Sequence, residues 1–282
     1  MGSYLILGGT GKVGRRLGRI LEAAGHEVRL ASRSGATRFE WGDDSTWAPA
    51  LHGTTAVFIV GPGSASDWSG DLSRFLAIAH HEGVRRAVLL SARGVEFLAT
   101  GAVASSERAL RLGPVPWTIL RPSHFSQNFT EAMFAPIDGQ IVAPVGDGAE
   151  PFIDVDDIAA VAATTLVSDD YIGETIELSG PRALTFDEAA TVLQRISGTP
   201  ITFVDEDDVA HIERLQAAGT PEGYIQWRMA MLGGIRSGSD AYVSSGTQRV
   251  LGRPATSFDE WAEREVPAAN WATESGGDLA HD

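Results

Sequence analysis

The chain has 282 residues, of which 43% are apolar and 21% are charged, a composition that supports a buried core and excludes an intrinsically disordered protein. Its formal net charge of −15 disfavours binding to the phosphate backbone of a nucleic acid, and the complete absence of cysteine excludes disulfides, thiolate nucleophiles and cysteine-ligated metals. No apolar run approaches the length of a membrane span and no secretory signal pattern opens the sequence, so we expect a cytoplasmic protein without a membrane partner.

The first 124 residues alternate short apolar runs with amphipathic segments. Runs rich in Val, Ile and Leu predict strands over 3–7, 27–31, 38–41, 55–60, 86–91 and 117–120. Helical patterns lie between them, up to residue 24 and over 71–82 and 103–112. Continuous apolar strands separated by helices are typical of a parallel sheet that is covered on both faces. We therefore predict an α/β fold with a doubly wound, Rossmann-type parallel sheet.

The rest of the chain is less regular. Residues 125–150 are rich in loops, and a helix over 154–167 and a strand over 174–178 follow. Capping-box spacing at Thr185–Glu188 and at Ser257–Glu260 predicts the start of two helices, and further helices fit 206–217 and 222–232.

These elements predict a Rossmann domain with a smaller C-terminal substrate lobe. The Rossmann domain covers residues 1–124 and is completed by 151–180, and the substrate-binding lobe covers 125–150 and 181–267. The polar, Gly-rich segment 268–282 is predicted to be a flexible tail.

The glycine-rich turn after the first strand is the strongest motif. It reads Gly8, Gly9, Thr10, Gly11, Lys12, Val13 and Gly14, and it opens a predicted helix. Gly8 permits a tight turn, Gly11 lets a pyrophosphate approach the backbone, and Gly14 lets the helix pack on the strand. Free N–H groups and the positive end of the helix dipole then face the phosphates. This strand–turn–helix context predicts a dinucleotide site.

The end of the second strand indicates which dinucleotide binds. An NAD site usually carries an acidic residue there, on the ribose hydroxyl. This chain has Ser32, Arg33 and Ser34 instead, about 20 residues after the last glycine. A guanidinium group with hydroxyl neighbours suits a 2′-phosphate, because its planar fork binds phosphate oxygens in pairs. We therefore predict that NADP(H) is the cofactor.

Several motifs in order along the chain resemble the NmrA-like branch of the atypical short-chain dehydrogenases. Besides the glycine-rich turn and Arg33, they are Trp117–Phe129 (WTILRPSHFSQNF), Phe152–Ala159 (FIDVDDIA), Ser179-Gly180-Pro181 and Leu184–Ala189. A narrower similarity, to the festuclavine synthase and agroclavine dehydrogenase group, rests on Ala31–Ser34, Phe39–Trp41, Thr46-Trp47 and Gly252–Pro254. That group reduces a cyclic iminium carbon with NADPH.

The resemblance implies where the site residues lie. Residues 8–14 would bind the pyrophosphate, and Arg33 with its serine neighbours would bind the adenosine-ribose phosphate. Asn128 would point towards the substrate pocket. The other cofactor positions that the resemblance implies are Gly61, Pro62, Ser91, Ala92, Pro122, Ser123 and Phe125. These positions agree with the rule that ligands bind beyond the carboxyl ends of parallel strands.

The chain departs from short-chain dehydrogenases at the proton donor. Many of them use a Tyr-x-x-x-Lys pair, and some NmrA-like reductases keep the lysine alone, on the helix after the fifth strand. Here the only lysine is Lys12, none of the four tyrosines has a lysine at that spacing, and Ala102–Glu107 of the helix lacks one. Either the protein is an NADP(H)-sensing regulator without turnover, or its electrophile needs no strong general acid.

An iminium carbon fits the second case, because hydride addition to it leaves a neutral amine. A quinone or enone also fits, since its reduced oxyanion is delocalised. Catalysis would then depend on the orientation of the nicotinamide against the substrate. Residues that could line the substrate pocket are Phe125, Asn128, Phe129, Phe134, Tyr224 and Trp227.

Two polar residues at predicted strand ends are candidates for catalysis. Ser91 could hydrogen-bond the substrate or the nicotinamide ribose, and His124 could donate a proton near pH 7. Asp154, Asp156 and Asp157 are expected to cap a helix. The pair His80-His81 lacks a third ligand at metal-site spacing, so we expect no metal.

The sequence thus predicts an NADPH-dependent reductase of a small cyclic imine or iminium. A quinone or enone reductase of the same fold is the alternative, and a non-catalytic NADP(H)-sensing regulatory protein is the alternative of another class. The sequence leaves the oligomeric state open.

Overall fold

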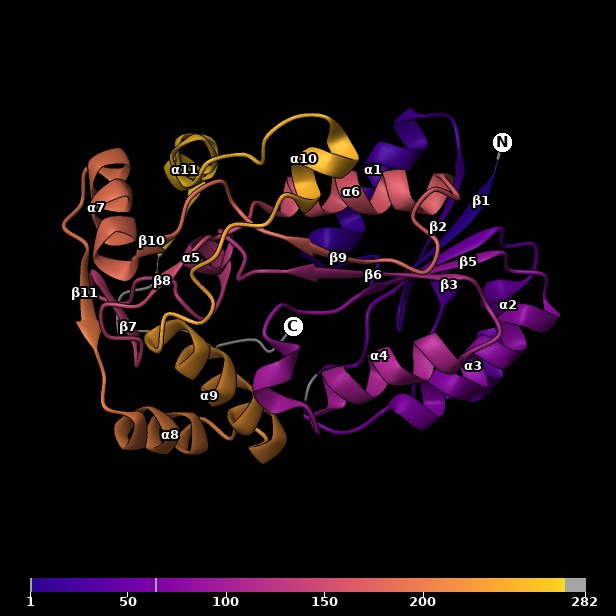
Figure 1. The fold of residues 1–282 in the computed structure, drawn as a ribbon, viewed down its shortest axis with the longest axis horizontal. Coiled ribbons are helices and arrows are strands. Elements are labelled where there is room, and N and C mark those ends of the chain that lie inside the picture. Colours follow the sequence, from indigo (N-terminus) through magenta and orange to yellow (C-terminus); the bar gives the residue numbers. More distant parts are fainter. Residues whose placement is uncertain (1, 64, 272–282) are drawn as a thin grey trace.

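Seven strands form the central sheet of the computed structural model, which describes residues 2–63 and 65–271 (Figure 1). Their order is β3-β2-β1-β4-β5-β6-β9, and every neighbouring pair is parallel. The strands are β1 (Ser3–Leu7), β2 (Glu27–Ser32), β3 (Thr37–Arg38), β4 (Ala56–Ile59), β5 (Arg86–Leu90), β6 (Trp117–Pro122) and β9 (Thr175–Leu178). The strand order reverses between β1 and β4, so the predicted doubly wound sheet is confirmed.

Helices cover both faces of this sheet (Figure 1). On one face lie α1 (Lys12–Ala23) and α6 (Val155–Val167), and on the other α2 (Trp47–Leu51), α3 (Ser69–His81) and α4 (Ala102–Leu112). Alternate strand residues enter different cores: Leu5 packs in the core that contains Phe75 of α3, and Ile6 packs in the core that contains Ile158 of α6. Because both faces are buried at the centre of the sheet, strands β1, β4 and β5 are apolar along nearly their whole length.

A smaller lobe lies beside the carboxyl ends of the strands (Figure 1). Its core is aromatic and includes Phe129, Phe134, Phe152, Phe186 and Trp261, each 0–1% exposed. Two small sheets pair β7 with β11 in parallel and β8 with β10 antiparallel. The elements are α5 (Asn128–Glu131), β7 (Gln140–Ala143), β8 (Ala149–Glu150), β10 (Leu184–Thr185), α7 (Phe186–Ser197), β11 (Thr202–Asp205), α8 (Asp208–Ala217), α9 (Glu222–Arg236) and α11 (Phe258–Glu265). Helix α10 (Gly246–Leu251) packs on α6 instead.

Both predicted capping boxes are present, at Thr185 and Ser257. The predicted third strand is present, but it covers Thr37–Arg38 instead of 38–41. The residues after them turn inward, where Trp47 donates its indole N–H to the Glu40 carbonyl oxygen at 2.9 Å. The sequence also missed β7, β8, β11 and α5, since two to four residues are too few to show a period.

The first residues of the predicted flexible tail, 268–271, make defined contacts. Ala268 still belongs to a short 3₁₀-helix (Val266–Ala268), and the Trp271 indole donates to the Phe129 carbonyl oxygen at 2.8 Å. The part of that prediction over 272–282 lies outside the described residues. Among residues 2–63 and 65–271, we find no helix with both the length and the apolarity that crossing a bilayer requires.

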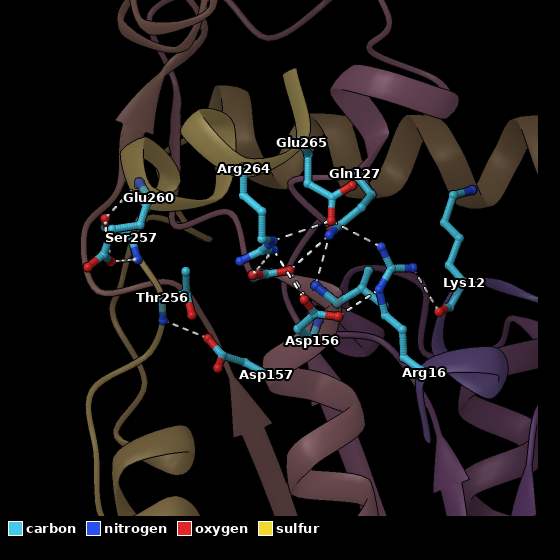
Figure 2. Close-up of polar contacts among 12 residues, drawn as sticks. Lys12, Arg16, Gln127, Asp156, Asp157, Thr256, Ser257, Glu260, Arg264 and Glu265 are labelled. Carbon is cyan, nitrogen blue, oxygen red and sulfur yellow. Dashed lines mark hydrogen bonds and ion pairs between the residues drawn. The ribbon is translucent and has the colours of Figure 1, made fainter. Parts of the chain in front are cut away.

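An ion-pair network fastens the lobe to the sheet beside the start of α1 (Figure 2). Arg16 of α1, 9% exposed, donates to Asp156 at 2.7 Å and lies 3.3 Å from Glu265 of α11. Arg264 donates to Asp154 at 2.6 Å and lies 3.2 Å from Asp156. Asp154 caps α6, as predicted, by accepting from the Asp156 N–H. The side chains of Asp156 and Asp157 bind arginines, an arrangement the sequence analysis did not foresee.

We predict that Gly14→Ala lowers the thermal unfolding temperature. A Cβ at this position of α1 would lie 2.2 Å from the Gly8 carbonyl oxygen and 2.9 Å from Gly9 Cα. Overpacking of this kind costs about 1–3 kcal/mol of unfolding free energy. The matched control is Gly70→Ala in α3, where an added Cβ meets no described atom within 4 Å and should leave the temperature unchanged or raised. Equal melting of the Gly14→Ala variant and the wild type would contradict this packing.

Candidate functional site

The carboxyl ends of β1, β4, β5 and β6 lie along one edge of the sheet, facing the lobe (Figure 1). This edge contains the turn after each strand, because all four strands point the same way. Most of the predicted site residues lie in these turns, at 8–14, 61–62, 91–92 and 122–125. Ligands of doubly wound sheets bind at this edge, where the strand order reverses.

The turn between β1 and α1 is shaped as a phosphate cradle. Gly8 has φ +68°, and Gly11 precedes α1 without any side-chain cap on the helix start. A Cβ on Gly9 would lie 2.7 Å from Leu30 Cβ, so the backbone here is pressed against β2. The first N–H groups of the helix therefore remain available to an anion, and Thr10 beside them is exposed. These residues fit a dinucleotide pyrophosphate.

Arg33 directly follows β2, next to this cradle. The two turns are joined by a hydrogen bond from the Gly9 N–H to the Ala31 carbonyl oxygen, 3.1 Å long. Arg33 is exposed and makes no hydrogen bond or ion pair with any described residue. Its neighbour Arg38 is paired with Asp43, so Arg33 is the guanidinium group that is free for a ligand at this point.

Two tryptophan side chains contact the turn after β4. A Cβ on Gly61 would lie 2.4 Å from the Trp68 ring, and the Trp41 indole donates to the Val60 carbonyl oxygen at 3.0 Å. Gly61 is half-buried and Pro62 exposed. Both predicted residues therefore lie at the surface of the strand-end edge, and the two tryptophan side chains pack behind them.

Ser91, directly after β5, is bonded to a buried carboxylate that the sequence analysis did not identify. Its hydroxyl donates to Glu107 of α4 at 2.6 Å, and Glu107 is 1% exposed. Arg121 donates two hydrogen bonds to the same carboxylate, at 2.8 and 2.6 Å, and Arg111 lies 2.9 Å away. Burial by itself would raise the pKa of Glu107, but Arg121, Ser91 and Arg111 outweigh it, so this pKa lies below its ordinary value. The ionised carboxylate engages the hydroxyl hydrogen, and Ser91 offers its lone pairs to a ligand.

His124 is the accessible polar side chain in the turn after β6. Its backbone N–H donates to Glu150 Oε1 at 2.9 Å, and its ring Nδ1 lies 3.2 Å from the same oxygen. The neighbouring Ser123 is 3% exposed, and its hydroxyl donates to the Pro151 carbonyl oxygen. Because the Ser123 side chain bonds to the backbone, a cofactor contact at Ser123 would come from its main chain, and it stays a prediction. Ala92 and Phe125 are half-buried at the same edge, and Pro122 is buried.

Behind His124 lies a buried group of charges that sequence spacing did not reveal. Glu150 of β8 is 0% exposed, Asp240 in the loop after α9 is 1% exposed, and Arg93 after β5 is 2% exposed. Arg93 Nε lies 3.2 Å from Asp240 Oδ1. A ring nitrogen of His124, a carboxylate oxygen of Glu150 and a carboxylate oxygen of Asp240 all lie within 4.8 Å of one another. Burial raises the pKa of Asp240 to about 7, with a further contribution from the charge of Glu150 against those of Arg93 and His124.

The predicted aromatic wall divides into two groups. Phe129 and Phe134 are 0% and 1% exposed inside the lobe core, so the prediction that Phe129 contacts the substrate is corrected: it packs against other phenylalanines instead. Asn128 is also buried, at 8% exposed.

Tyr224 and Trp227 are half-buried on α9, with ring centroids 5.7 Å apart. Helix α9 reaches the strand-end edge, since a Cβ on its Gly223 would lie 2.0 Å from the Ala65 carbonyl oxygen in the loop after β4. These two rings therefore remain candidates for a substrate wall.

Comparison with known proteins identifies the family. A family model described as NAD(P)H-binding matches residues 8–169. The chain is 34% identical to the oxidoreductase YesF of Bacillus subtilis, with 95% of this chain and 96% of YesF aligned. It is 30% identical to festuclavine dehydrogenase of Aspergillus fumigatus, covering 95% and 99% of the two chains. It is 32% identical to a (4-alkanoyl-5-oxo-2,5-dihydrofuran-3-yl)methyl phosphate reductase of Streptomyces griseus, covering 94% and 98%.

Solved structures share the fold. Triphenylmethane reductase of Citrobacter sp., solved with NADP(H), matches with a TM-score of 0.73 at 21% identity, over 94% of this chain and 99% of that one. The negative transcriptional regulator NmrA, solved with NAD, matches with a TM-score of 0.73 at 15% identity, over 95% and 96%. Since the family model spans more than half of the chain and full-length relatives reach 30% identity or more, this protein belongs to the NAD(P)H-binding family.

Proposed function

We propose that the protein is an NADPH-dependent reductase that acts on a small organic electrophile, in the first place a cyclic iminium ion. The observation that carries this proposal is the hydrogen bond from Ser91 to Glu107, at the point where a short-chain dehydrogenase would need a proton donor. When bound, the nicotinamide supplies hydride. For an iminium ion, the rest of catalysis comes from groups that bind, orient and shield the reactants.

The cofactor would lie along the strand-end edge. Residues 8–14 and the start of α1 bind the pyrophosphate through backbone N–H groups. Arg33, with the hydroxyls of Ser32 and Ser34, binds the 2′-phosphate and so favours NADPH over NADH. Gly61 and Pro62 then support the middle of the cofactor, and Ser91 and Ala92 support its nicotinamide end.

An iminium ion suits the polar groups at that end. The hydroxyl hydrogen of Ser91 is engaged by Glu107, so Ser91 is an acceptor for an N–H group and a poor proton donor. Hydride addition to an iminium carbon forms a neutral amine, which requires no proton. The similarity to festuclavine dehydrogenase over nearly the whole chain supports the same substrate class.

A conjugated carbonyl, either a quinone or an enone, is the second candidate substrate. The observation that favours it is His124, a partly accessible imidazole whose ring nitrogen lies 3.2 Å from Glu150. An imidazole at this place can donate a proton to a reduced carbonyl compound. The Streptomyces griseus relative is named as the reductase of a ring with a carbonyl group, which supports this candidate.

A regulatory protein that senses NADP(H) is the candidate of another class. The shared fold of NmrA, a negative transcriptional regulator, favours it, and the cofactor residues serve both functions equally. Only turnover distinguishes the two.

We predict that Arg33→Ala weakens NADPH binding about 10- to 100-fold, since one hydrogen-bonded charge pair contributes about 1.5–3 kcal/mol. NADH binding should remain nearly unchanged, because NADH lacks the 2′-phosphate. Calorimetric titration with both nucleotides measures the ratio. Arg182→Ala, at an exposed arginine paired with Glu188 on the lobe, is the matched control and should change neither affinity. Equal losses for the two nucleotides would contradict the role of Arg33.

We also predict that the purified protein oxidises NADPH in the presence of at least one member of a panel of cyclic iminium ions, quinones and enones. Absorbance of the reduced nicotinamide reports the rate, and NADH is tested in parallel. Turnover of iminium ions alone would support the first candidate, and turnover of carbonyl compounds the second. Tight NADPH binding without turnover of any panel member would contradict the reductase and favour the regulator.

A further inference from the structure

Three side chains from distant parts of the chain come together in the interior, behind the strand-end edge of the sheet. We call His124, Glu150 and Asp240 the proton cluster. The side chain of His124 is 11% exposed, whereas Glu150 and Asp240 are buried, at 0% and 1% exposed. Only the histidine therefore reaches a ligand, and its Nε2 has no partner among the described residues while its Nδ1 faces Glu150.

The charges in and around the proton cluster balance when the cluster carries one proton. Glu150 and Asp240 carry two negative charges when ionised, and among the described residues Arg93 is the arginine paired with Asp240. Tyr242, whose ring lies 3.7 Å from the Arg93 guanidinium carbon, donates its hydroxyl to Glu177 and cannot neutralise the remaining charge. An uncompensated buried charge is costly, so one proton shared among the three side chains makes the group neutral.

We propose that the proton cluster stores one transferable proton and that His124 delivers it to a conjugated carbonyl substrate after hydride addition. This inference rests on the proposed reductase function and assigns Glu150 and Asp240 as positioning residues for it. It supplies the acid that the absent Tyr-x-x-x-Lys pair would provide in a short-chain dehydrogenase.

The step balances. Hydride brings an electron pair to the β-carbon of the enone, and the electrons of the C=C bond move through the carbonyl to give an enolate. As the Nε2–H bond of His124 breaks, its electron pair stays on the ring and Nδ1 takes up the stored proton through Glu150, so the imidazole stays neutral. The departing proton forms a new O–H or C–H bond on the substrate. The cluster is left with one negative charge. After the product leaves, His124 regains the proton from water.

The ionisation of Asp240 agrees with this assignment. Burial and the nearby charge of Glu150 raise its pKa to about 7, so this carboxyl group holds a proton at neutral pH that an ordinary aspartate would have lost. Because the groups interact, the proton belongs to the cluster rather than to one residue. A divalent metal ion on the same atoms would leave a net positive charge in the buried site beside Arg93, and the charge balance therefore favours the proton.

The first test needs neither cofactor nor substrate. Infrared spectra of the ligand-free protein are recorded from about pH 6 to about pH 8, for the wild type and for Asp240→Asn. We expect a protonated-carboxyl C=O band in the wild type that disappears as the pH rises through about 7, and we expect Asp240→Asn to lack it. A wild type without this band at the lower pH would overturn the assignment. So would binding of Zn²⁺ that Asp240→Asn abolishes, since it would identify a metal site.

The second test compares two substrates in the same protein. His124→Gln should lower the ratio of enone to iminium turnover about 100-fold or more, because general acid catalysis contributes about 10²–10⁴-fold only where a proton is needed. In the wild type, enone turnover should fall as the pH rises through about 7, since the acid form is lost, and Asp240→Asn should remove that inflection.

His80→Gln on the exposed end of α3 is the matched control and should leave the turnover ratio unaltered. An unaltered ratio in His124→Gln would overturn the proton delivery, because a merely structural histidine would affect both substrates equally. Failure of the wild type to oxidise NADPH with any electrophile would instead contradict the reductase function, and the infrared result would still decide whether the cluster holds the proton.

Discussion

The rest of the structure depends on one kind of interaction, the ion pair between a buried carboxylate and a guanidinium group. Glu107 is fixed by Arg121 beneath the substrate edge, and Asp154 is fixed by Arg264 where the lobe meets the sheet. Each carboxylate is at most 1% exposed, and removing its partner would leave an uncompensated charge in the interior, at a cost of about 3–5 kcal/mol. In a chain with a net charge of −15, arginines are thus committed to specific acids, and these pairs set how the lobe lies against the strand ends.

The two halves of the site are built in different ways. The cofactor half depends on backbone: a tight turn, a helix start without a cap and glycines whose neighbours leave no space for a Cβ. The substrate half depends on side chains from the turns after β5 and β6, from β8 and from the loop after α9. The backbone half is suited to a ligand common to the whole family. The side-chain half can change through the lobe without disturbing the cradle, as expected where one fold serves several substrates.

This division also explains what the sequence could predict. The parallel sheet and the glycine-rich turn follow from local patterns, and the structure confirms both. Glu107, Glu150 and Asp240 do not follow from any local pattern, because each meets its partners only across the fold. Phe129 was misassigned for a related reason: an aromatic residue near a strand end can face a ligand or a core, and only the packing of the lobe decides between them.

The network around Arg16 has a consequence for how the protein is made. Arg16 lies in the first turns of the chain's first helix, yet it pairs with Glu265, a separation of 249 residues. While the chain emerges from the ribosome, this arginine can meet Asp156 long before Glu265 has been made. Helix α11 therefore adds a late contact to a nucleotide-binding half whose sheet precedes it in the chain. Contacts of such high sequence separation slow folding, and the support that Glu265 gives to the helix behind the cofactor cradle forms only after Glu265 has been made.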